Sequence, residues 1–218
     1  MSAQPPDQNP EPTVSKIEQG LRALNVEFTC QQVEKLEQFI GLLQKWNNSF
    51  NLVADSSEDE LISRHLLDSL SISEHISGSI VADIGSGAGF PGVPLAIFHP
   101  HTRFILLDSN GKKTRFLFQV KLALGLENLT VENCRIEHYQ SFEQIDIVTC
   151  RAFSTLQDTV VLGDSLLGES TRLLAMKGRF PQSEVDALPD GFRVTNSTAL
   201  DIPGLPVERH LVEIGRTG

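Results

Sequence analysis

The stretch that decides the fold is Asp83-Ile84-Gly85-Ser86-Gly87-Ala88-Gly89-Phe90-Pro91-Gly92. It follows a short apolar run at 79–84 that is typical of a buried strand. Glycines at alternate positions let the backbone turn sharply and approach a ligand closely. Pro91 and Pro94 suit the opening turn of a helix. A strand, a glycine turn and a helix in this order predict a ligand site at the carboxyl end of the first strand of an open α/β sheet.

Similar apolar runs follow along the chain and alternate with helical patterns. We expect further strands at 102–108, 129–132, 145–150 and 173–176, and helices at 93–98, 112–124 and 156–167. This alternation predicts a mostly parallel sheet that is covered on both faces. The last two runs, at 192–197 and 210–214, are joined only by a loop, so we expect an antiparallel edge there. The predicted fold class is α/β, of the Rossmann-like kind.

The first eighty residues have a helical pattern and no strand pattern. Apolar residues recur every three or four positions at 17–24 and 33–47, and a third helix is expected over 61–76 after the acidic start at 56–60. We predict a disordered tail over 1–13, a helical extension over 14–77 and a ligand-binding domain over 78–218. Residues 1–80 contain 5 basic and 12 acidic side chains, so the helical extension is acidic.

The composition is that of a soluble globular protein. Hydrophobic residues make up 40% of the 218 and charged residues 21%. No apolar run approaches the roughly 20 residues that span a bilayer, and the N-terminal stretch lacks the regions of a signal peptide. Cys30, Cys134 and Cys150 are widely spaced, so neither structural zinc nor a disulfide framework is expected. These features predict a cytoplasmic protein that neither spans nor binds a membrane and that holds no metal ion.

Three kinds of nucleotide-like ligand are considered for the glycine turn. A phosphate-binding Walker loop needs Gly-Lys-Ser or Gly-Lys-Thr, which is absent here. A dinucleotide fingerprint needs a small residue where Phe90 stands, and it would put Asp83 beside a pyrophosphate of the same charge. S-adenosylmethionine has no phosphate, and its sulfonium and ammonium groups would be attracted by Asp83. The loop with Gly85, Gly87 and Gly89 therefore favours S-adenosylmethionine.

A second acid and a third strand end agree with this ligand. Asp108 ends the run at 102–108, where a carboxylate can accept hydrogen bonds from both ribose hydroxyls. NAD enzymes share that feature, and capping of the next helix is an alternative role. Ile136 and Glu137 follow the third strand, where Ile136 can pack on an adenine face. Together the spacing predicts a class I methyltransferase.

The chain also resembles one bacterial family, the ribosomal small-subunit methyltransferase G family, also called glucose-inhibited division protein B. The motifs that carry the resemblance are Trp46-Asn47, Asn51-Leu52, Arg64-His65-Leu66-Leu67-Asp68-Ser69, the glycine turn at 83–92, Leu106-Leu107-Asp108-Ser109, Arg151-Ala152-Phe153, Met176-Lys177-Gly178 and Glu208-Arg209-His210. The resemblance implies a helical N-terminal part on a Rossmann-like methyltransferase domain. It implies S-adenosylmethionine as the cofactor, S-adenosylhomocysteine as the product, and methylation of guanine N7 in the 530 loop of 16S rRNA (guanine-527 in the usual rRNA numbering).

The family's cofactor contacts can be carried over by position. They fall on Gly85, Phe90, Ile136, Glu137 and Arg151. Departures from the family pattern are mild: Val53-Ala54-Asp55 replaces a threonine-led run, Ala88 replaces a common proline, and Cys150 stands where serine is frequent. None of them removes a cofactor contact, although the first alters the rim that faces the substrate.

The chemistry of guanine N7 suits the motifs that are present. N7 has a free lone pair and carries no proton, so alignment of two reactants can supply most of the rate. The sequence has no Pro-Cys nucleophile, and the fourth strand ends in Cys150-Arg151-Ala152-Phe153 instead of a motif for exocyclic amines. Arg151 is the candidate catalytic residue, in contact with the cofactor carboxylate or with guanine O6. A surface ion pair with Asp146 or Asp158 is its alternative role.

A local basic strip can reconcile RNA binding with the net charge of −10. Residues 101–121 contain five basic side chains and one acid, a net charge of +4. The candidate substrate-binding residues are Lys112, Lys113, Arg115, Lys177 and Arg209. The expected partner is 16S rRNA within the small ribosomal subunit or an assembly intermediate, bound by a monomer.

Other functions and roles remain open from the sequence. The alternatives are methylation of another RNA, a protein or a small molecule, a cofactor-binding protein without catalysis, and an NAD-dependent oxidoreductase. His65 and Asp68 lie on one helix face, either below the cofactor cleft or as a structural pair.

Overall fold

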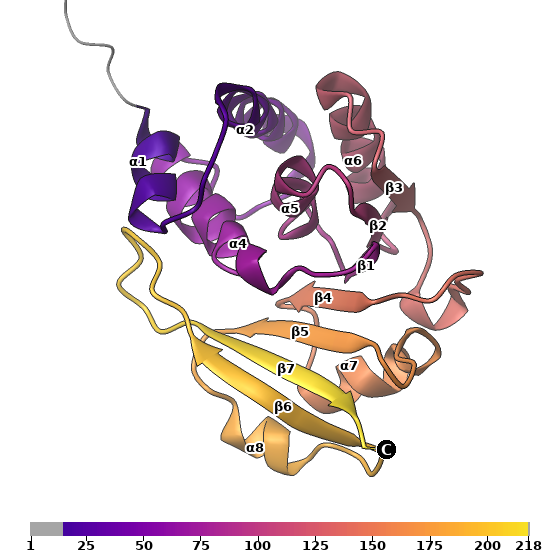
Figure 1. Cartoon of the computed structure of the whole chain (residues 1–218). Helices are drawn as coiled ribbons and strands as arrows, with labels where there is room; N and C mark the ends of the chain where they lie inside the picture. The colour runs from indigo at the N-terminus through magenta and orange to yellow at the C-terminus, as the bar shows by residue number, and fades with distance from the viewer. Residues whose placement is uncertain (1–14, 218) are drawn as a thin grey trace, which may run out of the picture.

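The computed structural model describes residues 15–217, so the tail predicted over 1–13 lies outside the described residues. The described chain forms a seven-stranded sheet in the order β3-β2-β1-β4-β5-β7-β6 (Figure 1). The strands are β1 (Ile80–Ile84), β2 (Arg103–Leu107), β3 (Leu129–Glu132), β4 (Ile147–Arg151), β5 (Arg172–Lys177), β6 (Phe192–Ala199) and β7 (His210–Arg216). Each strand overlaps a run predicted from the sequence, and the predicted α/β class is confirmed.

Strand direction and register decide where a ligand can bind. Strands β1 to β5 are parallel, and β7 runs antiparallel to β5 and β6. The predicted antiparallel C-terminal edge is confirmed, with β7 between β5 and the outermost strand β6. Ile84 lies opposite both Leu107 and Cys150. The residues that follow these three positions therefore emerge at the same edge of the sheet.

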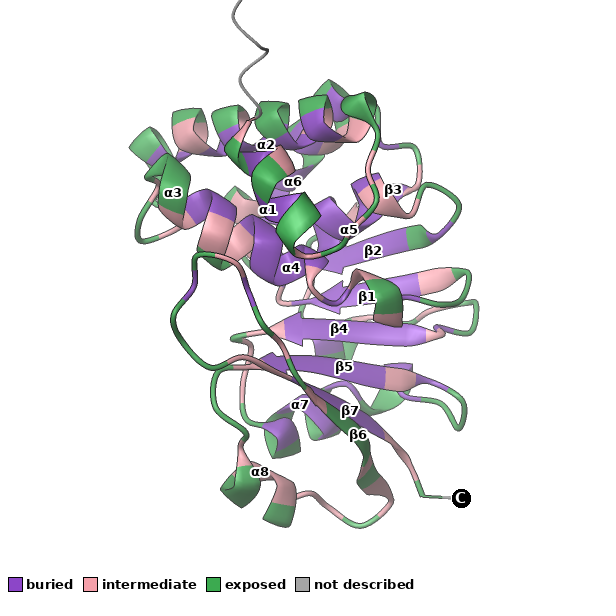
Figure 2. Ribbon diagram, turned by 60° about the vertical axis from the view of Figure 1, so that its left-hand side comes forward, coloured by how far each residue is buried: buried purple, intermediate pink, exposed green. Residues whose placement is uncertain are grey.

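The sheet separates two clusters of buried apolar side chains, and Figure 2 shows its central strands buried along most of their length. Val81, Phe104 and Leu106 belong to one cluster, together with the N-terminal helices, α5 (Gly92–Phe98) and α6 (Gly111–Leu124). Ala82 and Ile105 belong to the other cluster, with α7 (Leu156–Leu162) and the 3₁₀ turns η3 (Ile136–His138) and η4 (Asp164–Leu166). Adjacent residues thus face opposite layers, as strand geometry requires.

The N-terminal helices are α1 (Lys16–Ala23) and α2 (Cys30–Phe50). Thr29 begins α2 with a capping box, in which the Thr29 and Gln32 side chains accept each other's backbone N–H. Phe39 of α2 packs on Phe90, with 5.1 Å between ring centroids, and Trp46 packs on Phe116 of α6 at 5.7 Å. The helical segment therefore shares one continuous core with the sheet and forms a layer of the same fold.

The third helical segment is shorter than the prediction over 61–76. It consists of α3 (Glu58–Glu60), a π-helical stretch η1 (Leu61–Leu67) and α4 (Asp68–Leu70), followed by a 3₁₀ turn η2 (Ser73–His75). Ser71 explains the early end, because its hydroxyl donates to the Asp68 carbonyl and competes with helix continuation. π-Helical turns are rare and occur often at functional sites. Here the stretch presents Arg64 and His65 to the edge where the parallel strands end.

Two smaller differences concern the C-terminal half. The predicted helix at 156–167 breaks at Gly163 and continues only as the 3₁₀ turn η4. A short helix, α8 (Gln182–Asp186), has no counterpart among the predictions because five residues are too few for a clear helical period. Within residues 15–217, no helix is both long enough and apolar enough to cross a membrane.

Candidate active site

The glycine turn after β1 is built by backbone hydrogen bonds and positive φ angles. Gly85 and Gly87 have φ of +66° and +59°, which L-residues rarely adopt. A Cβ at Gly85 would also collide with the Phe153 ring, so glycine suits this position. Gly89 has φ of +97°, but a Cβ there would meet Val93 and Leu117 of the core. Gly85 and Gly87 line cavities above the turn, whereas Gly89, also predicted as a cofactor contact, lies against the core.

Asp83 lies beneath this turn and has no exposed surface. One carboxylate oxygen accepts from the Gly92 N–H at 3.1 Å, and the other accepts from the Thr149 hydroxyl at 3.2 Å. Burial raises the pKa of Asp83 to about 7. The sequence predicts Asp83 as an acid beside the loop that attracts a cationic ligand, whereas the structure has its carboxylate buried and hydrogen-bonded within the protein. Asp83 joins the start of α5 to β4 and shapes the turn from below.

A first cavity of about 350 Å³ opens above the turn, and Asp108 forms part of its wall. The Asp108 carboxylate accepts from the Gly87 N–H at 2.9 Å and from the Asn110 N–H at 2.8 Å. Each oxygen keeps acceptor capacity for a hydroxyl. The cap of α6 is Asn110, whose side chain accepts from the Lys112 N–H, so the capping role considered for Asp108 is wrong.

The first cavity also has apolar residues in its walls. Ile136, 5% exposed, lines it together with Phe153 and Leu162. Glu137 also lines the cavity, and its Oε1 lies 3.7 Å from Nη1 of Arg135. A nucleoside suits this lining, because the Asp108 carboxylate can accept from a ribose and the apolar side chains can pack on a base. The predicted cofactor residues Gly85, Asp108, Ile136 and Glu137 all line this cavity.

A second cavity of about 610 Å³ adjoins the first. The two share Gly85, Lys113 and Ala152 in their walls. Ala152 follows β4 with φ of +49°, an uncommon conformation for a residue with a side chain. Basic side chains line the second cavity: Arg64, Lys113, Arg151, Lys177 and Arg209. A ligand in the first cavity can therefore present its reactive end to a second molecule in a basic pocket.

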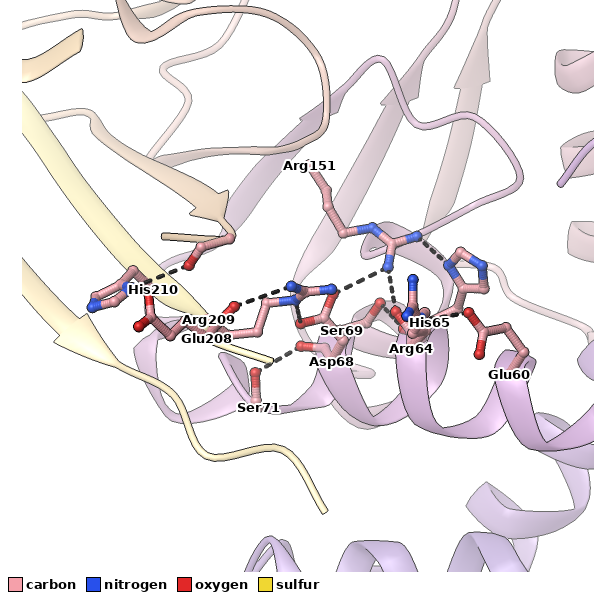
Figure 3. Close-up of polar contacts among 11 residues, drawn as sticks. Glu60, Arg64, His65, Asp68, Ser69, Ser71, Arg151, Glu208, Arg209 and His210 are labelled. Atoms are coloured by element: carbon pink, nitrogen blue, oxygen red, sulfur yellow. Dashed lines mark hydrogen bonds and ion pairs between the residues drawn. The ribbon is translucent and has the colours of Figure 1, made fainter. Parts of the chain in front are cut away.

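Arg151 ends β4 and points into the second cavity. One terminal nitrogen donates to the Arg64 carbonyl at 2.9 Å and to the Asp68 carboxylate at 3.2 Å, and the other donates to Nδ1 of His65 at 2.8 Å (Figure 3). The guanidinium also lies over the Phe90 ring, 5.2 Å from its centroid. The partner is Asp68, so the alternative ion pairs with Asp146 and Asp158 are wrong.

Asp68 connects three elements that are far apart in the sequence. It is 2% exposed and accepts from Arg151 through one oxygen and from Nε of Arg209 through the other, at 3.2 Å each. Arg209 precedes β7, on the β6–β7 connection that reaches the N-terminal helices in Figure 1. Asp68 therefore fixes two guanidinium groups at the wall of one cavity (Figure 3).

His65 completes this cluster as a neutral ring. Burial, together with the charge of Arg151, lowers its pKa to about 4. Since arginine can only donate, Nδ1 of His65 accepts and the proton resides on Nε2. The ring stacks on Phe90, with 5.0 Å between centroids and 22° between planes. Phe90, predicted as a cofactor contact and 3% exposed, therefore lines the second cavity and supports His65 and Arg151.

The residues of the predicted basic strip do not all lie at the cavities. Lys113 lines both cavities and lies 4.0 Å from Asp108, whereas Lys112 and Arg115 are exposed and line neither. Lys177 lines the second cavity, where its ammonium is bound to the Ser154 carbonyl and to Glu184. The sequence pattern predicts one basic strip that contains Lys112, Lys113 and Arg115. Successive positions of a helix point in different directions, so these side chains do not share one surface.

Three further residues of the second cavity were missed or set aside. For His65 and Asp68 the sequence left a purely structural role open. Arg64 was not predicted as a site residue. Their signal was the spacing in Arg64-His65-Leu66-Leu67-Asp68, which places polar groups on one helix face and leucines on the other. Residues 15–217 contain no cluster of three or more His, Cys, Asp or Glu side chains suited to a metal ion. Burial raises the pKa of Cys150 to about 12, so its thiol is not a nucleophile.

Comparisons with known proteins assign the chain to a family. The family model "rRNA small subunit methyltransferase G" (GidB) matches residues 32–212. A ribosomal RNA small subunit methyltransferase G from Nitrosococcus oceani is 46% identical over 198 residues, which are 91% of this chain and 92% of the relative. One from Ectopseudomonas mendocina is 48% identical over 201 residues, 91% of this chain and 94% of the relative. The chain belongs to the rRNA small subunit methyltransferase G family.

Solved structures support the fold of this methyltransferase G family member. TrmN from Thermus thermophilus has a TM-score of 0.53 and 17% identity, covering 68% of this chain and 47% of that one. The ribosomal protein L11 methylase from Lactobacillus delbrueckii subsp. bulgaricus has a TM-score of 0.52 and 15% identity, covering 70% and 77%. At these identities the likeness concerns the fold alone. Family membership confirms the predicted enzyme class, a methyltransferase that uses S-adenosylmethionine, and removes the oxidoreductase alternative.

Proposed function

We propose that this protein transfers the methyl group of S-adenosylmethionine to N7 of a guanine in 16S rRNA. The position implied by the family is guanine-527 in the 530 loop. The observation that carries the proposal is the meeting of two cavities at Gly85 and Ala152, one suited to a nucleoside and the other lined by arginines. Such a junction aligns a methyl donor with an acceptor, and alignment supplies most of the rate for this kind of reaction.

The first cavity suits the cofactor, which supplies an electrophilic methyl group when bound. Asp108 accepts hydrogen bonds from the ribose hydroxyls, while its backbone donors from Gly87 and Asn110 keep the carboxylate oriented. Ile136 and Leu162 pack on the base. Gly85 and Ala152 leave room where the two cavities meet, since neither carries a side chain larger than a methyl group.

The second cavity suits a nucleophile that needs no deprotonation. The acid–base groups beside Arg151 are already engaged: both Asp68 oxygens accept from arginines, and His65 is neutral and accepts from Arg151. Neither is placed to remove a proton from a substrate. Guanine N7 has a free lone pair and no proton, so the engagement of the two groups nearest Arg151 agrees with attack by N7.

Arg151 can orient the guanine through its remaining donors. Arginine has five N–H groups, and three of them are used by Arg64, Asp68 and His65. Two remain for an acceptor in the cavity. Guanine presents O6 next to N7 on its major-groove edge, and an N–H from Arg151 to O6 positions N7 toward the junction. The fixed partners of Arg151 reduce the entropy lost when that bond forms.

We propose the small subunit, or a precursor of it, as the cytoplasmic binding partner of a monomer. Arg64, Lys177 and Arg209 line the second cavity, and their positive charges suit contacts to phosphates. Sedimentation of the purified protein with unmethylated subunits tests the partner, and light scattering tests the monomer.

The experiment for the proposed function is nucleotide mass mapping of 16S rRNA from cells that lack this protein. We expect one missing methylguanosine in the 530 loop, restored by the wild-type gene and by Asp59→Asn, an exposed surface control, but not by Arg151→Ala. An unchanged rRNA map, or a missing methyl group on another RNA or a protein, would refute the proposal.

A further inference from the structure

A third hollow lies outside the two cavities of the candidate active site, between α2 and α6. It measures about 470 Å³, and its walls include the half-buried Trp46 of α2 and Arg115 and Phe118 of α6. Phe118 is 51% exposed although it is a large apolar side chain. An exposed aromatic side chain beside a hollow favours a binding surface, because covering it removes apolar area from water.

The aromatic side chains of this groove are held from behind. Trp46 packs on Phe50, with ring centroids 5.2 Å apart, and on Phe116, at 5.7 Å. Phe116 is fully buried, so the indole is fixed by the core while part of it stays accessible. A rigid, partly exposed indole is a good platform for a flat ring, since little conformational entropy is lost on stacking.

The charge around the groove has one sign. Helix α6 carries Lys112, Lys113, Arg115 and Lys121 and contains no acidic residue. Of these four, only Lys113 faces a carboxylate, and Arg115 forms no ion pair with any residue of the described range. In a chain with a net charge of −10, a helix of uncompensated cations is an exception that favours an anionic partner.

The groove adjoins the cofactor cavity. Asp108 lines the first cavity and Gly111 the groove, so the short turn between them separates the two hollows. The Asn133 side chain lines the groove and donates to the Asp108 carbonyl at 3.0 Å. Lys113 of α6 lines the second cavity and the next residues of that helix, Thr114 and Arg115, line the groove, so an RNA strand in the second cavity can reach the groove along α6.

We propose that this groove, defined by Trp46, Arg115 and Phe118, binds an unpaired base of the RNA substrate next to the methylated guanine. The base stacks on the aromatic side chains, Arg115 contacts its phosphate, and the Gln119 amide faces its edge. This inference rests on the proposed function for the identity of the RNA. It adds a stacking site to the phosphate contacts expected of the basic strip.

The chain offers a direct probe, because Trp46 is its only tryptophan. A single-stranded RNA oligonucleotide is titrated against Trp46 fluorescence, while the anisotropy of a labelled copy measures binding independently. We expect quenching that saturates together with binding. We expect Phe118→Ala and Arg115→Ala each to weaken oligonucleotide binding about tenfold, the order of one lost base stack or charged contact. Absence of binding, or binding without quenching, overturns the proposal.

Matched controls lie on the same helix. Leu122→Ala removes an exposed apolar side chain outside the groove, and Lys121→Ala removes a charge that forms no ion pair within residues 15–217. Both should keep the quenching. A loss of affinity shared by all four variants would overturn the stacking site. Reduced subunit binding with unchanged oligonucleotide binding would point to a protein partner instead, and would also overturn it.

The outcome is separable from the proposed function. Methylation of unmethylated small subunits by Arg115→Ala and Phe118→Ala should show a raised KM with unchanged kcat, because neither side chain lines the methyl-transfer cavities. If the wild-type protein methylates no rRNA, the proposed function fails even when oligonucleotides quench Trp46. If it methylates rRNA and all variants share its KM, only the groove proposal fails.

Discussion

The two cavities of this methyltransferase G family member are built in different ways. The first is made by consecutive residues at three strand ends: the glycine turn, Asp108, and Ile136 with Glu137. The second is made by charged side chains from residues 64–68, 151 and 209, which Asp68 brings together. Local backbone geometry therefore makes the first cavity, proposed for the cofactor, whereas long-range ion pairs make the second, proposed for the substrate. The two sides should respond differently to mutation.

The largest effect is expected for Asp68→Asn in the second cavity. The change leaves Arg151 and Arg209 partly buried without their common carboxylate, and breaking a buried ion pair costs about 3 kcal/mol or more. We expect this loss in the free energy of urea unfolding, together with nearly complete loss of turnover. The control Asp59→Asn, which breaks an exposed ion pair with Lys16, should change neither. Equal stability of the two variants would contradict the role of Asp68.

A smaller effect is expected for Arg151→Lys, which keeps the charge. Lysine cannot bond Asp68, His65 and the Arg64 carbonyl while also reaching a base, so we expect kcat to fall about 100-fold. Cofactor affinity, measured by calorimetry, should change little. A variant with a raised KM and normal kcat on saturating subunits would show that Arg151 only binds RNA.

The first cavity is tested by Asp108→Ala. Loss of hydrogen bonds to a charged acceptor should weaken S-adenosylmethionine and S-adenosylhomocysteine binding about 10- to 100-fold, measured by calorimetry. Subunit binding should be unchanged, because Asp108 does not line the second cavity. The opposite pattern, with only RNA binding reduced, would exclude Asp108 as the ribose acceptor.

The variant Asp83→Asn tests whether Asp83 supports the glycine turn from below or contacts the cofactor directly. The folded-state pKa of about 7 lies above the ordinary value of 3.8, so wild-type stability falls as pH rises from about 4 to 7, by at most about 1.4 kcal/mol per pH unit. The variant should lack this loss. His65 acts oppositely, since its lowered pKa of about 4 makes stability fall as pH decreases below about 6.5.

The difference between the unfolding profiles of Asp83→Asn and the wild type therefore isolates Asp83. Cofactor affinity should change less than about threefold, below 1 kcal/mol, because the carboxylate lies outside both cavities. A tenfold loss of affinity would restore the direct electrostatic contact that the glycine turn suggested.

The smallest effects are expected from the divided basic strip. Lys112→Ala should reduce the slope of log K against log salt for RNA binding by about 1 unit and leave cofactor affinity unchanged. Lys113→Ala should also affect the cofactor by a few-fold, because Lys113 lines both cavities. Identical behaviour of the two variants would contradict this division.

The same contrast explains what the sequence could predict. The strands, the glycine turn, Asp108 and Ile136 follow from local period and spacing, and the structure has them at the predicted positions. The Asp68 cluster joins residues up to 141 positions apart, which no local pattern reveals. The direction of the Asp83 side chain was not predictable for a related reason. Residue spacing predicts where a strand ends, but not to which side its last side chains point. Lys113 and Arg115 could be separated only once the faces of α6 were known.

The central claim is that N7 of one guanine, aligned at the junction of the two cavities, attacks the methyl group without a base. The most direct measurement uses small subunits reconstituted with 16S rRNA that carries a single 7-deazaguanosine at position 527, assayed for methyl transfer by the purified protein. The substitution replaces N7 by a carbon and keeps O6 for Arg151. We predict that these subunits bind with nearly unchanged affinity and accept no methyl group. Methylation of the 7-deaza base, at any atom, would contradict the account.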